Sequence, residues 1–375
     1  MLPASLCAAS LFLAAVPVRA ETVIRVATLN SGLERRGPGL LLRDILSGQD
    51  EQVLQVRDLI RSAAPDILLL TNFDHDLGLV ALRAFNDLLR EAGGGFDHVF
   101  ALAPNTGMAT GLDLDNDGWL GGARDAQGYG EFAGQGGLAL LSRYPVDTAA
   151  VRDFSELLWK DLPGSDMPAT GPDKDAARIL RLSSVAHWDV PVLAPCRPLR
   201  LLAYHATTPA FDGPEHRNSR RNRAQNLFWL DYLDGKLAWP APTSPFVLLG
   251  DANLDPADGK GDTGAVRKLL ADARLQDPAP RSERGVRAAR AQGGANRGQA
   301  GDPALDTADW RDEGGPGNLR VDYVLPAAGL EVRGSGLVWA DESAEDPSVG
   351  REGPVLRHAL VWVDILWEAG SECVD

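Results

Sequence analysis

The chain has 375 residues, of which 44% are hydrophobic and 24% are charged. This composition is that of an ordinary globular protein with a sizeable core, and it excludes wholesale disorder. The formal net charge is −15, which argues against a protein that binds nucleic acid through bulk positive charge. An enzyme that holds phosphate with a few local groups remains compatible with this charge.

The N-terminus carries an apolar run at 6–16, followed by Val18-Arg19-Ala20. The run is too short to span a bilayer, and the small-x-small tripeptide is typical of a signal-peptidase site. We therefore expect residues 1–20 to be a signal peptide, a secreted or periplasmic protein, and no transmembrane segment in the mature chain. The alternative is a buried N-terminal strand or helix, since no basic residue precedes Arg19.

Cysteine usage fits export, because removal of Cys7 with the signal would leave Cys196 and Cys373. An even pair in an oxidising compartment favours one disulfide. Such a bridge would tether the C-terminal tail. Two unpaired thiols are the alternative.

Hydrophobic patterning predicts alternating strands and helices along the chain. Strands are expected at 22–29, 67–70, 136–141, 199–205, 246–250, 320–326 and 359–366, and helices at 50–62, 80–91, 222–233 and 266–270. Loops are expected at 104–134, 153–177 and 279–318. Because strand signals continue on both sides of every loop and no repeat is visible, we expect one domain over 21–375 with long inserted loops.

Polar side chains follow several of the predicted strands: Asn30, Asp74, His205, Asp251 and Asn253. An α/β scaffold gathers a site from such strand ends. Two further candidates are Asp322, inside a strand, and His358, which directly precedes the last one. A lone histidine at a strand end is more often structural, so the order of the motifs has to carry the argument.

That order resembles the endonuclease/exonuclease/phosphatase superfamily with the deoxyribonuclease I-like fold. The matching motifs, over about residues 22–368, are ATLN, PDILLL, GLALLSRYP, AYH, RRNRAQ, GDANLDP, RVDYVL and RHALVWV. The resemblance implies an α/β protein built as a four-layer αββα sandwich, with two packed mixed β-sheets flanked by helices. It also implies a phosphoric-ester hydrolase, with phosphodiester cleavage by a His-activated water as the leading expectation.

Site roles follow from the resemblance. His358 is expected to be the general base and Asp322 the carboxylate that orients it. Asp251 and Asn253 would hold the nucleophile or the phosphate, and His205 would donate to a phosphoryl oxygen or help the leaving group. The alternative for GDANLDP is a plain strand-to-turn connection.

The resemblance also implies a divalent metal, Mg²⁺ or Mn²⁺, but two of the expected positions depart from the family pattern. The usual glutamate ligand is replaced by Asn72, and an aspartate near the metal is replaced by Arg357. Losing this charge weakens a cation site, although Arg357 could contact phosphate instead. A relocated metal site, a metal-sparing site and a weakened enzyme all remain open.

Three residues are candidate metal ligands: Asn30, which is also a candidate phosphate ligand, Asp74 and Asp251. Asp76 could replace Asp74 in this role. A separate metal is suggested by 113–118, whose sequence DLDNDG fits the first half of an EF-hand loop with Asp113, Asp115 and Asp117 as ligands. Position twelve is Arg124 instead of glutamate, so a plain polar loop is the alternative to a structural Ca²⁺ site.

A basic cluster at 216–223 precedes the helix predicted at 222–233. Arginines are unfavourable at a helix N-terminus, so Arg220 and Arg221 are candidate phosphate ligands, with a solvated helix start as the alternative. The expected partner is a phosphate ester, either a small molecule, a lipid head group or a nucleic acid, and we expect a monomer. A phosphomonoesterase, a phospholipid head-group hydrolase and a weakened phosphate-binding module are the alternative functions.

Overall fold

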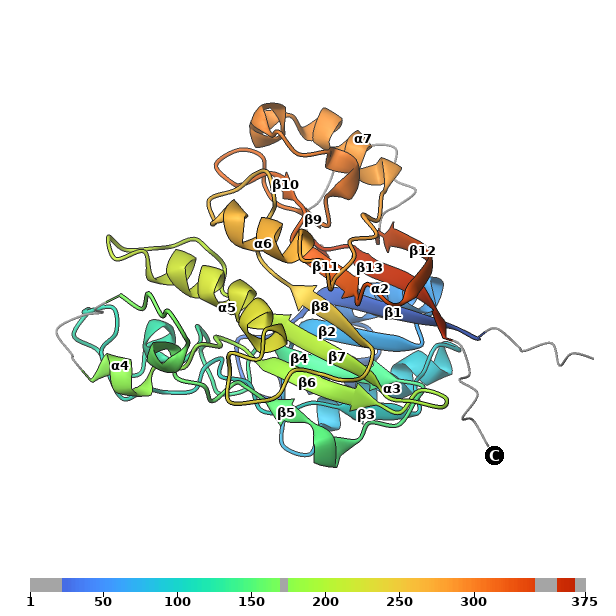
Figure 1. Ribbon diagram of the computed structural model, residues 1–375, viewed down its shortest axis with the longest axis horizontal. Coiled ribbons are helices and arrows are strands. Elements are labelled where there is room, and N and C mark those ends of the chain that lie inside the picture. Colours follow the sequence, from blue (N-terminus) through green and yellow to red (C-terminus); the bar gives the residue numbers. More distant parts are fainter. Residues whose placement is uncertain (1–21, 169–174, 341–355, 368–375) are drawn as a thin grey trace, which may run out of the picture.

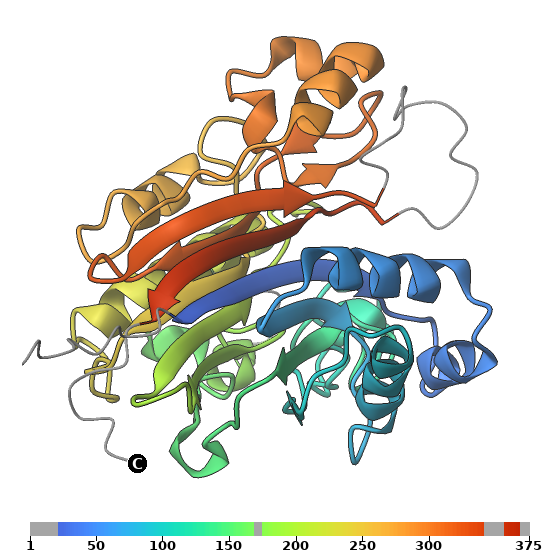
Figure 2. The same cartoon turned by 90° about the vertical axis from the view of Figure 1, so that its right-hand side faces the viewer.

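Two mixed β-sheets pack face to face and carry helices on their outer faces (Figures 1 and 2). The computed structural model describes residues 22–168, 175–340 and 356–367. The four-layer αββα sandwich predicted from the sequence is confirmed. The predicted signal peptide at 1–20 and Cys373 lie outside the described residues, so export and the disulfide stay predictions.

The first sheet has six strands. In sheet order they are β12 (Glu331–Val338), β13 (Leu360–Trp367), β1 (Thr22–Leu33), β2 (Ile67–Phe73), β4 (Gly137–Ser142) and β3 (His98–Phe100). Strands β1 and β2 pair in parallel, and the other neighbours are antiparallel. Its outer face is covered by α1 (Leu40–Ser47), α2 (Glu51–Ala63) and α3 (Val80–Glu91). Helix α2 begins where the Asp50 side chain accepts a hydrogen bond from the backbone N–H of Val53.

The second sheet has five strands. In sheet order they are β11 (Asp322–Pro326), β8 (Phe246–Asp251), β7 (Leu199–His205), β6 (His187–Val192) and β5 (Arg152–Asp153). Only β7 and β8 are parallel. Helices α5 (Arg217–Leu233) and α6 (Thr263–Leu270) cover its outer face. In α5 the aromatic side chains Phe228, Trp229 and Tyr232 are fully buried against this sheet.

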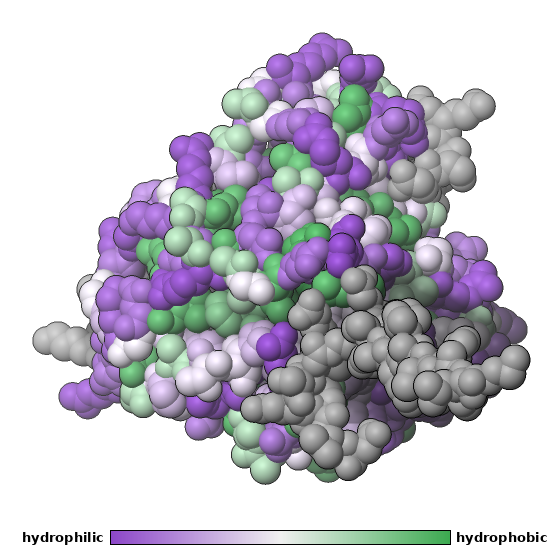
Figure 3. Space-filling model, turned by 45° about the vertical axis from the view of Figure 1, so that its right-hand side comes forward, coloured by the Kyte–Doolittle hydropathy of each residue, from purple (hydrophilic) through white to green (hydrophobic). Residues whose placement is uncertain are grey.

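The strand sequences are apolar on both faces because one face packs against the other sheet and the opposite face packs against helices. Alternate residues of β1, such as Ile24 and Val26, point toward the second sheet, and Ala27 and Leu29 point toward the helices. Burying one large side chain of this kind contributes roughly 2 kcal/mol. On the face shown in Figure 3, hydrophobic residues gather in a band across the middle of the molecule, between more hydrophilic regions.

One expectation about the loops needs correction. The 279–318 stretch, predicted to be loop, contains α7 (Glu283–Gln292) and the short strand pair β9 (Ala308–Asp309) and β10 (Asn318–Leu319). Together they form a projection above the end of the sandwich (Figures 1 and 2). Helix α7 buries Arg284 rather than a hydrophobic stripe, and that guanidinium pairs with Asp309 at 2.8 Å. No described helix is long and apolar enough to cross a membrane.

Candidate active site

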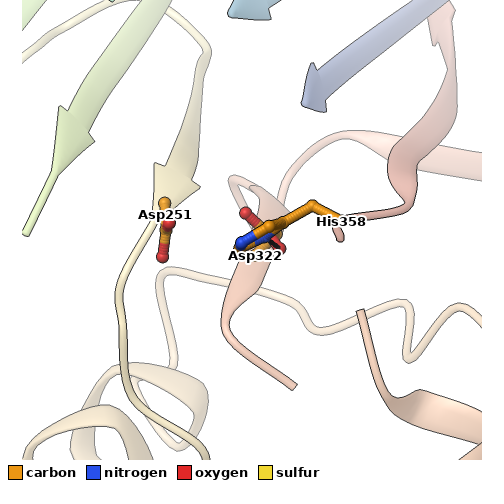
Figure 4. Close-up of side chains that lie close together, drawn as sticks. All are labelled: Asp251, Asp322 and His358. Carbon is orange, nitrogen blue, oxygen red and sulfur yellow. Dashed lines mark hydrogen bonds and ion pairs between the residues drawn. The ribbon is translucent and has the colours of Figure 1, made fainter. Parts of the chain in front are cut away.

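The predicted catalytic residues come together at one end of the sandwich, from both sheets. Asp251 ends β8, and its two neighbours in the second sheet pair directly with it: His205 at the end of β7 and Asp322 at the start of β11. Asn30 comes from β1 of the first sheet, and its side-chain amide donates to Asp251. His358 lies just before β13, so the site spans the boundary between the sheets (Figure 4).

His358 and Asp322 form a hydrogen-bonded pair. Nδ1 of His358 lies 2.8 Å from Oδ2 of Asp322, and both residues are buried. Burial lowers the pKa of an imidazole, but the charge and the hydrogen bond of Asp322 outweigh it, so the pKa of His358 is raised. The rings of Trp310 and His358 pack in a T-shaped contact at a centroid distance of 5.3 Å. With Nδ1 engaged, Nε2 is the nitrogen free to accept a proton.

Thr307 holds both members of this pair, a role that no sequence motif predicts. Its hydroxyl donates to Oδ2 of Asp322 at 2.9 Å and accepts from the backbone N–H of Val321 and Asp322. Its carbonyl accepts from the N–H of Ala359, next to His358, at 2.7 Å. Thr307 therefore fixes the carboxylate by its side chain and the histidine segment by its backbone.

Asp251 is the centre of the second group of polar residues. Its Oδ2 accepts from Nδ2 of Asn30 at 2.9 Å and lies 3.5 Å from Nε2 of His205, and its Oδ1 accepts from the N–H of Asn253 at 2.8 Å. Burial, and then the charge of Asp322, raises the pKa of Asp251. Burial also lowers the pKa of His205 in spite of Asp251, which favours the neutral imidazole.

A cavity of about 1180 Å³ opens onto these residues. It contacts His358, Asp251, Asn253, His205 and Asn30. Apolar and charged side chains also line the cavity. They include Leu114, Trp159, Leu180, Tyr129, Phe211, Arg124 and Arg217. The volume exceeds that of a phosphate group several times, so the cavity has room for the organic part of an ester.

Asp74 does not join the site as a metal ligand. Its carboxylate oxygens accept from the backbone N–H groups of Arg35 and Gly136, at 2.9 and 3.0 Å, and it does not line the cavity. Asp76 is also used by the backbone, because its two oxygens accept from Val80 and Ala81 at the start of α3. Both carboxylates that could have replaced the missing glutamate therefore have structural work in capping and turn formation.

The arginines predicted to bind phosphate are placed differently from the expectation. Arg221 lines the cavity, but its guanidinium donates to the carbonyls of Leu182, Arg181 and Ser183. Its burial lowers its pKa to about 9. Arg220 donates to the carbonyl of Asp166 and is not among the cavity residues.

Arg357 is exposed and is likewise not among the residues that line the cavity. The arginines at the start of α5 suggested a bound anion at this helix N-terminus. In the structure, a carboxylate of the protein itself takes that place. Asp212 accepts from the backbone N–H groups of Asn218 and Ser219 in the first turn of α5, at 2.6 and 3.1 Å. The geometry therefore gives no support to the phosphate role predicted for Arg220, Arg221 and Arg357.

Comparison with known proteins agrees with this arrangement. A sequence profile described as the endonuclease/exonuclease/phosphatase family matches residues 41–348. The chain belongs to this family. It is thus a hydrolase of phosphoric esters, with specificity left open by the family alone. A search of curated protein sequences gives no match.

Solved structures with a similar fold share little sequence with this family member. The endonuclease/exonuclease/phosphatase from Beutenbergia cavernae DSM 12333 has 18% identity and a TM-score of 0.52, covering 92% of this chain and 72% of that one. Sphingomyelinase C from Streptomyces griseocarneus has 16% identity and a TM-score of 0.45, covering 92% and 99%. The 3' phosphatase NExo from Neisseria has 15% identity and a TM-score of 0.46, covering 92% and 100%.

The family typically uses divalent metals, and the residues present fit one. Asp251, Asp322 and His358 have ligand atoms that all lie within 4.8 Å of one another. Oδ1 of Asp322 is buried without a hydrogen-bond partner, and such an orphaned oxygen is costly unless a proton or a cation satisfies it. The donor set is oxygen-rich, as Mg²⁺ and Mn²⁺ prefer.

The acidic loop at 113–118 forms a second group of converging carboxylates. Oxygens of Asp113, Asp115 and Asp117 lie within 4.8 Å of one another. Asp113 accepts from the backbone N–H groups of Asp117 and Gly118, which wraps the loop around this point. Oδ1 of Asp115 is buried without a hydrogen bond.

Proposed function

We propose that the protein hydrolyses phosphodiesters with a water molecule that His358 activates. The observation that carries the proposal is the His358–Asp322 pair, placed in a cavity beside Asp251. Nε2 of His358 is left to accept a proton from water, since Nδ1 is held by Asp322. Asp322 fixes the ring and stabilises the imidazolium that forms.

The reaction balances as a simple displacement. The water oxygen forms a bond to phosphorus while its proton passes to Nε2 of His358, and the bond from phosphorus to the leaving oxygen breaks. The leaving oxygen takes up a proton from solvent, and the imidazolium of His358 returns its proton to solvent. A bound divalent cation would supply charge neutralisation at the phosphoryl oxygens. His205 and Asn253 line the same cavity and contact Asp251, so they can orient those oxygens.

The direct test is the His358→Ala variant with bis-p-nitrophenyl phosphate as substrate. Loss of the general base is expected to lower turnover by about 10²–10⁴-fold. His98→Ala is the matched control, because His98 lies on β3 and does not line the active-site cavity. Turnover at the wild-type level in His358→Ala would refute the mechanism.

A second candidate substrate is an ester with an apolar portion, such as a phospholipid head-group ester. Tyr129 and Phe211 line the cavity and are 70% and 79% exposed, so they offer apolar surface at its mouth. A panel of phospholipid vesicles, small diesters, monoesters and DNA separates the candidates. Phosphate binding without turnover on any member would favour the weakened binding module.

Export is part of the proposal. The apolar run at 6–16 and the small-x-small tripeptide ending at Ala20 support it. Expression of the full chain in a secreting bacterium should give a mature protein in the periplasm or medium whose sequence starts at Glu21. An intact N-terminus in the cytoplasmic fraction would contradict it.

The acidic loop at 113–118 is proposed to bind a structural Ca²⁺. The three converging aspartates and the unpartnered oxygen of Asp115 support this proposal. Calcium accepts six to eight oxygen ligands in flexible geometry, and a polar loop can provide several of them from backbone carbonyls.

A further inference from the structure

The end of β2 lacks the carboxylate expected for the metal in this family, because Asn72 stands there. A different carboxylate reaches the same place from the neighbouring strand. Strands β1 and β2 run in parallel and pair Leu33 with Phe73 at their ends. Glu34 is the next residue after β1, so the sheet register itself places it beside the end of β2.

Contacts around Gly136 show where the Glu34 side chain points. A Cβ on Gly136 would lie 2.7 Å from Oε2 of Glu34 and 3.2 Å from Oδ1 of Asn72. Both oxygens therefore converge on one small volume, above a residue that has no side chain to fill it. Glu34, Asn72 and Asn30 all line the same cavity as His358 and Asp251.

The Glu34 carboxylate has no hydrogen bond or ion pair among the described residues, and the cationic side chain nearest in sequence is used elsewhere. The guanidinium of Arg35 pairs with Asp44 at 2.7 Å and Asp50 at 3.3 Å. Glu34 is exposed to solvent, and Arg35 acts on it through its charge without contacting its carboxylate. This corner of the cavity therefore offers a carboxylate that no cationic side chain contacts directly.

We infer that Glu34 replaces the missing family glutamate as the carboxylate ligand of a divalent cation, with Oδ1 of Asn72 as its neighbouring ligand. Small hard cations such as Mg²⁺ use one or two carboxylates and keep several waters, so this pair meets the need. Asn72 is held in place because its Nδ2 donates to Oδ1 of Asn30 at 3.0 Å. The inference rests on the proposed phosphoesterase function and relocates its cation to a residue that follows a different strand.

Binding of Mn²⁺, followed by electron paramagnetic resonance, tests the inference without measuring activity. All variants carry Asp115→Ala, so that the acidic loop at 113–118 does not contribute. Glu34→Gln keeps the size of the side chain and removes the charge, and it is expected to weaken Mn²⁺ binding at least tenfold, as the loss of an anionic ligand requires. Glu131→Gln, at an exposed position outside the cavity, is the matched control and should bind as the parent does.

Restoring the family carboxylate gives the decisive second variant. Asn72→Glu in the Glu34→Gln protein should recover Mn²⁺ affinity, because it places a carboxylate on the other side of the same volume. Unchanged affinity in Glu34→Gln would overturn the inference and favour Asp251, Asp322 and His358 as ligands. Failure of the folded double variant to recover affinity would also count against it.

The outcome is separable from that of the proposed function. Mn²⁺ binding that depends on Glu34, in a protein with no turnover on any ester, would support the inference and contradict the hydrolase. Turnover that depends on His358, in a protein whose Mn²⁺ affinity is unchanged by Glu34→Gln, would support the hydrolase and contradict the inference about Glu34.

Discussion

At the scale of single residues, the hydrogen bond between His358 and Asp322 sets both the protonation state and the orientation of the base. Asp322 stabilises the imidazolium, which raises the pKa of His358. Only the neutral imidazole can accept a proton from water. In the proposed mechanism, the pH at which the site works is therefore controlled by Asp322, a carboxylate that does not line the cavity.

We predict a corresponding pH profile for kcat/KM. In the wild-type protein, activity should fall on the acidic side at a pH above the ordinary histidine value of 6.5. Asp322→Asn removes the charge that favours the protonated ring, so the acidic limb should move to lower pH. The plateau should also drop, by about 10²-fold or more, because the ring is no longer held as a base.

Steady-state rates between pH 4.5 and 9 check this prediction, with circular dichroism to show that the variant is folded. Asp189→Asn, which changes a fully buried aspartate that pairs with Arg200 and does not line the cavity, is a control for the removal of a buried carboxylate. An acidic limb that stays in place in Asp322→Asn would show that another group titrates.

The sequence was sufficient to predict site residues that belong to a motif. It was insufficient to predict those that reach the site only through the three-dimensional fold. The motifs shared with the family predicted Asp251, Asp322 and His358, and the structure brings them together. Thr307 and Glu34 follow no motif. Their positions depend on a loop segment folding back over β11 and on the register between β1 and β2, which no local pattern encodes.

At the scale of elements, strand and helix signals succeeded where hydrophobic residues repeat and failed where polar groups are paired internally. Strand β6 was missed because Asp189 and Pro191 interrupt its apolar run. Asp189 is nevertheless fully buried, since Arg200 and the hydroxyl of Tyr232 both donate to it. Helix α7 was missed for the same reason, because its buried face is centred on Arg284.

The acidic loop at 113–118 is the element with the clearest test. Calcium that binds only the folded state stabilises it, by about 2.7 kcal/mol at a concentration 100 times Kd. We expect Ca²⁺ to raise the melting temperature of the wild-type protein by several degrees, and not that of Asp115→Ala. Differential scanning fluorimetry with Ca²⁺ or EDTA measures this, and equal shifts in both proteins would remove the site from consideration.

At the scale of the whole molecule, the catalytic pair is divided between the two layers. His358 belongs to the segment that enters β13 in the first sheet, and Asp322 begins β11 in the second. Their 2.8 Å contact depends on the hydrophobic core that seats one sheet on the other. Fold-level stability and site geometry are therefore linked through the same packing.

Because the two residues come from different sheets, the rate of turnover should depend on how the two sheets are positioned relative to each other. A small displacement of one sheet against the other would lengthen the contact between His358 and Asp322 before any strand lost its backbone hydrogen bonds. Mild heating, or a substitution that creates a small cavity in the core, should therefore reduce turnover while the circular dichroism spectrum stays that of the native protein. The inserted 279–318 segment takes part in this alignment, because Thr307 contacts both Asp322 and the backbone next to His358.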